Sequence, residues 1–153
     1  MTSPEQLEAV ARAIIDENRY MTLGTADESG VPWVSPVWYA PAGYREFFWV
    51  SYPDARHSRN ITARPQIAIV IFDSRAPVGS GQGVYMPAIA EELTGAVLDQ
   101  GIQIFSRRSE LQGQRGWSRD DVQQPARLRL YRATASEHFV LDAGDRRIPV
   151  SLE

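Results

Sequence analysis

Several residue types that commonly carry chemistry are scarce or missing in this sequence. It contains no cysteine and no lysine, and only two of its 153 residues are histidine. Without cysteine the chain has no disulfide bond, thiol nucleophile or thiolate metal ligand. Without lysine it has no Schiff-base chemistry on its own side chains. The two histidines, His57 and His138, are too few for a histidine-rich metal centre, so we expect no metal site.

Long apolar runs and an excess of positive charge are also missing. No apolar run approaches the roughly 20 residues that a membrane helix requires, so we expect no membrane association. A net charge of −3 argues against nucleic-acid binding. The polar, acidic N-terminal pattern does not resemble a secretion signal, which predicts a cytoplasmic protein. The ordinary composition, 43% hydrophobic and 23% charged, predicts one globular domain over residues 1–153.

A helix is expected at the start of the chain, over about residues 4–18. Ser3 and Gln6 have the spacing of a capping box, and Pro4 occupies the first helical position. Apolar residues then recur on one face at helical spacing: Leu7, Val10, Ala11, Ile14 and Ile15. This helix is predicted to pack against whatever follows it.

Short strands separated by turns dominate the rest of the chain. A further helix is expected over Asp99–Arg108, and Asp120 begins a possible helical turn. Pro32 and Pro36 interrupt the second strand, which predicts a kink or an edge position for it. The pattern favours a mainly β, antiparallel barrel with flanking helices, because closure removes exposed sheet edges. The expected strands are Tyr20–Thr25, Val31–Ala40, Phe47–Tyr52, Gln66–Phe72, Gly83–Leu93, Arg127–Thr134, Glu137–Asp142 and Arg146–Leu152.

The stretch between the third and fourth strands is short, helical and basic. Asp54 is a candidate N-cap, and Arg64 before Pro65 ends the helix. Arg56, His57, Ser58, Arg59 and Asn60 follow the cap directly. A helix N-terminus with arginines and a hydroxyl is typical of a phosphate cradle. The same residues also fit a solvated basic helix between two strands.

Three blocks of the sequence resemble a known family. They are LGTADESGVPWVSPVWY, FFWVSYPDARHSRNITARPQIAIVIF and GVYMPAIAEEL, in that order. Together they resemble the pyridoxamine 5'-phosphate oxidase-like, FMN-binding split-barrel proteins. The resemblance implies an α+β split barrel and a homodimer with flavin mononucleotide (FMN) held at the subunit interface.

The resemblance also implies which residues would contact the cofactor. The family's basic pair on the phosphate falls on Arg56 and His57, although His57 stands where the family usually has lysine. Ser58, Arg59 or the helix N-terminus would compensate for the missing lysine charge. A cofactor-contacting glutamine falls near Gln82. The remaining implied contacts lie on the second and third strands and on the short helix: Ser35, Pro36, Val37, Trp38, Val50, Ser51 and Asn60.

The chemistry implied by the resemblance belongs to the cofactor, so no catalytic side chain is expected. A flavin-dependent oxidoreductase would transfer hydride to or from a small flat substrate. Two alternatives remain: a reductase using a deazaflavin coenzyme, and a non-enzymatic binder of flavin or haem. The Arg-x-His pair of true pyridoxamine-phosphate oxidases is missing from the C-terminal DRRIPVSLE, so that activity is not expected. Four aromatics are candidates for the substrate slot, or for ordinary core and interface positions: Trp33, Trp38, Tyr85 and Trp117.

Overall fold

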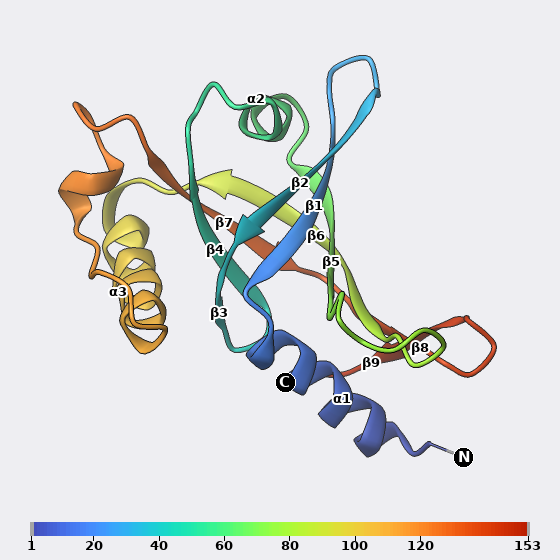
Figure 1. The fold of residues 1–153 in the computed structure, drawn as a ribbon. Coiled ribbons are helices and arrows are strands. Elements are labelled where there is room, and N and C mark those ends of the chain that lie inside the picture. Colours follow the sequence, from blue (N-terminus) through green and yellow to red (C-terminus); the bar gives the residue numbers. More distant parts are fainter. Residues whose placement is uncertain (1, 153) are drawn as a thin grey trace.

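The protein is a curled antiparallel sheet with helices around it (Figure 1). This computed structural model describes residues 2–152. The elements in chain order are α1 (Pro4–Glu17), β1 (Tyr20–Ala26), β2 (Pro32–Trp38), β3 (Ala40–Ala42), β4 (Glu46–Ser51), α2 (Arg56–Ala63), β5 (Gln66–Phe72), β6 (Gly83–Glu92), α3 (Gly95–Leu111), the 3₁₀ helix η1 (Arg119–Val122), β7 (Arg129–Ala135), β8 (His138–Leu141) and β9 (Arg147–Val150).

All strand pairs are antiparallel, in the order β2-β1-β5-β6-β7-β4-β3, and β8 joins β6 to β9. Helices α1 and α2 lie at opposite ends of the curled sheet, and α3 lies beside β3, β4 and β7 (Figure 1). The expected α+β split-barrel fold is therefore confirmed. None of the helices within residues 2–152 is long and apolar enough to cross a membrane.

The curl of the sheet brings its two edge strands together, and the chain passes from one edge to the other at Tyr39. Trp38 pairs with Tyr20 on β1, whereas Ala40 pairs with Phe48 on β4. The fully buried Tyr39 hydroxyl donates to the Ile15 carbonyl at 2.6 Å, which ties the crossing to α1. The single strand expected over 31–40 was wrong, since this crossing divides it into β2 and β3.

Two hydrophobic clusters lie on the two sides of the sheet. The barrel interior contains Leu23, Trp49, Ile69 and Met86, all buried. In β5 the buried and exposed residues alternate, as expected for a strand with one face inward. The outer cluster lies between α3 and the sheet, and its buried members are Ala40, Phe48, Leu93, Leu98, Ile102, Phe105, Val122 and Leu130.

Several element boundaries differ from the sequence-based expectations. Helix α3 extends beyond the predicted Asp99–Arg108 at both ends, from Gly95 to Leu111. Gly101 lies inside it despite the low helix propensity of glycine, and lets the helix approach the sheet closely. In β7 the neighbouring Leu130 and Tyr131 are both buried, since this strand has the barrel interior on one side and α3 on the other.

Gly101→Ala tests the packing of α3 on the sheet. A Cβ atom at Gly101 would lie 2.8 Å from Leu93 Cδ1 and 3.1 Å from Leu130 Cδ2, and both leucines are buried. Overpacking costs about 1–3 kcal/mol, against a gain of up to roughly 1 kcal/mol in helix propensity. We expect a net loss of about 1 kcal/mol in the free energy of unfolding, measured with urea.

The exposed Gln103, on the same helix, provides the control. Gln103→Ala should change stability by less than about 0.5 kcal/mol. A Gly101→Ala protein as stable as the parent would show that α3 does not pack as closely as described.

Candidate cofactor site

The N-terminus of α2 lacks a capping side chain. Its N-cap residue is Ala55, and no described side chain hydrogen-bonds to the helix N-terminus there. The expectation that Asp54 caps this helix was wrong, because the helix begins one residue later than that role requires. By contrast, Ser3 and Gln6 form the predicted capping box on α1. The first-turn N–H groups of α2 therefore remain available to an external acceptor.

Arg56 stands at this uncapped N-terminus. Its guanidinium carbon lies 4.2 Å from the centroid of the Trp33 ring, and Trp33 is 42% exposed. This cation–π contact fixes the side chain against β2 while one face of the guanidinium stays open. Arg56 forms no ion pair with any residue in 2–152. It lines a cleft of about 490 Å³ between α2 and the β1–β2 hairpin, and the other charged residues of that lining are Arg59, Asp27 and Glu28.

His57 faces β4 rather than standing free beside Arg56. Its Nε2 shares a hydrogen bond of 2.7 Å with Ser51 Oγ. Burial lowers the pKa of His57 below its ordinary value, so the imidazole is neutral at pH 7. The structure thus brings His57 and Ser51 together, as a neutral hydrogen-bonded pair without a fixed charge.

The next two predicted residues on α2 point into the protein. Asn60 is 4% exposed, and its Nδ2 donates to Thr25 Oγ1 at 3.0 Å. Thr25 Oγ1 in turn donates to the Trp33 carbonyl at 3.3 Å. Ser58 is 1% exposed, and its hydroxyl has no partner among the described residues. Both side chains pack against the barrel and hold α2 in place. Ser58 can therefore offer a ligand only its backbone N–H group.

The predicted residues of β2 lie on an edge strand. Strand β2 lies at one edge of the sheet, which explains why Pro36 is tolerated. On an edge strand a residue can lack its backbone N–H donor without breaking the hydrogen-bond ladder. Val37 is buried in the barrel interior, and Ser35 is half-buried. Trp38 packs instead with the outer cluster, as does Val50 on β4. The edge of β2 and the outer face of β4 therefore meet near Trp38.

Gln82 is not brought together with Arg56 within one chain. Its Nε2 donates to the Leu141 carbonyl at 2.9 Å, and its Oε1 accepts from the Leu141 N–H at 2.7 Å. The same oxygen accepts from the Gly83 N–H at 3.0 Å. This amide joins the loop before β6 to β8, which is a structural role.

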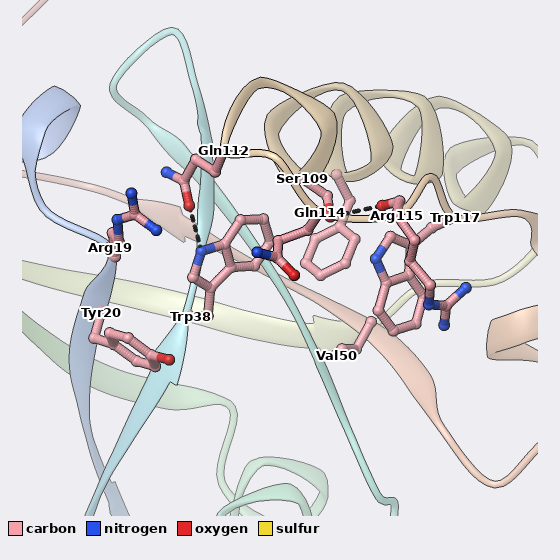
Figure 2. Close-up of a pocket in the computed structure, with 10 residues that line it drawn as sticks. Arg19, Tyr20, Trp38, Val50, Ser109, Gln112, Gln114, Arg115 and Trp117 are labelled. Atoms are coloured by element: carbon pink, nitrogen blue, oxygen red, sulfur yellow. Dashed lines mark hydrogen bonds between the residues drawn. The ribbon is translucent and has the colours of Figure 1, made fainter.

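A second cleft, of about 550 Å³, opens between β1, β2, β4 and the segment that follows α3 (Figure 2). We refer to it as the Trp38–Trp117 cleft. Phe105 stands edge-on to both indoles, with centroid distances of 5.0 Å to Trp38 and 5.3 Å to Trp117. The residues lining the cleft are Arg19, Tyr20, Trp38, Val50, Phe105, Ser109, Gln112, Gln114, Arg115 and Trp117.

Only two of the four candidate slot aromatics, Trp38 and Trp117, line this cleft. Trp33 contacts Arg56, and Tyr85 lies under the guanidinium of Arg147 at 4.5 Å. The sequence did not identify Arg19 as a site residue, nor the cleft residues of the 109–115 segment. They carry no shared motif, because distant parts of the chain meet only in the fold.

Comparison with known proteins places this arrangement in context. A family model described as Pyridoxamine 5'-phosphate oxidase matches residues 7–139. Among curated proteins, none matches the chain significantly in sequence. Three solved structures illustrate its likeness in fold.

The haem storage protein HutZ from Vibrio cholerae is 20% identical, with a TM-score of 0.65 over 82% of this chain and 87% of that one. A haem-binding protein from Mycobacterium smegmatis is 18% identical, with a TM-score of 0.72 over 99% of this chain but only 59% of its own length. An F420 reductase is 16% identical, with a TM-score of 0.59 over 84% of this chain and 94% of that one. At these identities the likeness concerns the fold alone.

The two histidines generate a prediction about pH. His138 Nε2 donates to the Tyr44 carbonyl at 2.6 Å, and burial lowers its pKa as it does that of His57. The unfolded chain therefore binds protons more readily than the folded protein below the ordinary histidine pKa of about 6.5. The free energy of unfolding should be insensitive to these groups above that pH and should fall as the pH drops below it.

The measurement is urea unfolding at about pH 7.5 and about pH 5.5, a window chosen above most carboxyl titrations. The double variant His57→Gln, His138→Gln keeps a side-chain N–H at both positions and should show a flatter pH dependence than the parent. An equally steep decline in both proteins would show that other groups control it.

Proposed function

The chain belongs to the pyridoxamine 5'-phosphate oxidase family, and from this premise we propose that it is a flavin-dependent oxidoreductase. In this proposal the phosphate of FMN binds at the N-terminus of α2. The flavin ring lies along the edge of β2, from Ser35 to Trp38, and against Val50 and Ser51 on β4.

The uncapped N-terminus of α2 is the observation that carries the proposal. Helix N-termini bind anions through free N–H groups and the helix dipole. Ala55 leaves those groups without a side-chain acceptor, and Arg56 adds a guanidinium held in place by Trp33. None of the first-turn side chains of α2 is acidic. Asp27 and Glu28 of the β1–β2 hairpin line the same cleft, opposite the positive charges of Arg56 and Arg59.

The fit of the remaining residues is uneven. His57 and Ser51 can offer hydrogen bonds to a ligand, but the buried Ser58 and Asn60 side chains act as support. A bound flavin supplies hydride transfer at its ring. The protein residues orient that ring: Trp38 is fixed by its Nε1, which donates to Gln112 Oε1 at 2.7 Å.

We also propose that two copies of the chain associate. An apolar hollow of about 440 Å³ lies on the outer face of the sheet, lined by residues that include Val34, Val70, Tyr85, Pro87 and Phe139. Val34 is 67% exposed in the single chain. An apolar face of this kind supports burial against a second copy.

A deazaflavin coenzyme is the second candidate. Two observations favour it: the neutral His57 gives the site less fixed charge than an arginine–lysine pair would, and the F420 reductase shares the fold. Haem is the third candidate, since HutZ and the M. smegmatis protein are named for haem. The two histidines favour haem less, because the ring nitrogens that would bind its iron are already engaged. His138 is buried and donates to the Tyr44 carbonyl, and His57 is hydrogen-bonded to Ser51.

Absorption spectroscopy during titration with FMN, the deazaflavin coenzyme and haem distinguishes the three candidates. Saturable binding of FMN supports the proposed function. Binding of the deazaflavin alone would make that coenzyme, and not FMN, the proposed cofactor. Binding of haem alone would contradict the proposal of a flavin-dependent oxidoreductase.

Arg56→Ala tests the phosphate position. Loss of a charge-assisted hydrogen bond costs roughly 1.5–3 kcal/mol, which weakens FMN binding by about tenfold or more. Riboflavin, which lacks the phosphate, should bind both proteins equally. Isothermal titration calorimetry measures all four affinities.

The control is Arg75→Ala, which removes an exposed arginine paired with Asp73 in the loop after β5. FMN affinity should stay unchanged in this protein. If Arg56→Ala binds FMN as tightly as the parent, the phosphate does not lie at α2.

A further inference from the structure

We propose that the Trp38–Trp117 cleft binds planar aromatic carboxylates and so selects the substrate class of the enzyme. This inference rests on the proposed function, because Trp38 and Val50 would adjoin the flavin ring. The rest of the cleft, formed by α3 and the segment after it, is free to hold a second molecule beside that ring.

The walls of the cleft suit a flat, apolar ligand. Trp38, Phe105 and Trp117 form a series of edge-to-face aromatic contacts, and Val50 adds an aliphatic surface. The volume of about 550 Å³ is in the usual range for a small-molecule site. Aromatic walls bind planar rings well, since both stacking and edge-on contacts are available.

These walls are held rigidly. The Trp38 indole donates to Gln112, as described above, and the Trp117 backbone N–H donates to Ser106 Oγ at 2.8 Å. Ser109 Oγ donates to the Arg115 carbonyl at 2.7 Å, which holds the segment after α3 against the helix (Figure 2). A preformed slot loses little entropy when a rigid ligand binds.

The charges that line the cleft are positive. Arg19 and Arg115 stand at opposite sides of it in Figure 2, and no Asp or Glu is among its described lining residues. Arg19 makes no ion pair with any residue in 2–152. The Arg115 guanidinium stacks 3.7 Å from the Trp117 ring centroid and pairs with Asp121 at 3.3 Å, which leaves further N–H donors.

The form of these donors favours a carboxylate over a phosphate. Guanidinium groups bind planar carboxylates through paired N–H donors. A phosphate dianion is held best by converging backbone N–H groups at a helix N-terminus. The cleft adjoins the C-terminal end of α3, where the N–H groups of Gln112, Gly113 and Gln114 are already bonded to carbonyls of the last turn.

The test is isothermal titration calorimetry with 2-naphthoate and its neutral methyl ester, on flavin-free and FMN-loaded protein. The two probes share the ring system and differ in charge. We expect naphthoate to bind at least about tenfold more tightly than the ester, as expected for a charge-assisted contact. Equal affinities would overturn the assignment of an anion site.

Matched variants locate the binding. Arg115→Gln and Arg19→Gln should each weaken naphthoate binding several-fold and leave the ester unchanged, while Trp117→Leu should weaken both ligands. Arg107→Gln, an exposed position on α3 outside the cleft lining, is the control and should change neither. If neither cleft arginine affects naphthoate binding, the proposal is wrong, even when every variant folds as the parent does.

The two proposals can fail separately. Naphthoate binding that depends on the cleft arginines, without FMN binding, would keep the anion site and reject the flavin function. FMN binding without preference for naphthoate over its ester would keep the flavin function and reject the substrate class.

Discussion

A buried hydrogen bond from Asn60 Nδ2 to Thr25 Oγ1 anchors α2 on the barrel, together with the packing of the buried Ser58 and Ile61. Thr25 Oγ1 donates in turn to the Trp33 carbonyl, and the Arg56 guanidinium stacks on the Trp33 ring. A continuous set of contacts thus runs from the barrel interior to Arg56, one of the two exposed arginines of α2. Removal of a buried partner of this kind leaves the other group unsatisfied, so the whole set is expected to be maintained together.

The same arrangement explains how a short helix can serve as an anion site. Helices of this length gain little stability from their own hydrogen bonds and rely on packing. Here the packing comes from Ser58, Asn60 and Ile61, which are all buried, while the opposite face keeps Arg56 and Arg59 exposed. Because interior contacts hold the helix, its N-terminus can do without a capping side chain.

The sequence predicted the fold better than it predicted the site. Capping chemistry at Ser3 and the alternation in β5 are local signals, and both appear in the structure as expected. The division of β2 from β3 depends on Tyr39 crossing between sheet edges, which no local pattern records. For the site, residue types correctly indicated a basic helix. They could not show that Asn60 points inward to Thr25 or that Gln82 is hydrogen-bonded to Leu141 on β8, because these contacts form only in the folded chain. The Trp38–Trp117 cleft could not be predicted, since its residues meet only through the packing of α3.

The central claim is that a phosphate group is recognised at the N-terminus of α2. Comparison of the affinities of the unmodified protein for FMN and for riboflavin tests it most directly, since the two ligands differ only in that group. The account predicts that FMN binds at least about tenfold more tightly, the contribution expected of one or more charge-assisted hydrogen bonds. Equal affinities for the two ligands would contradict it and would leave α2 as a structural helix.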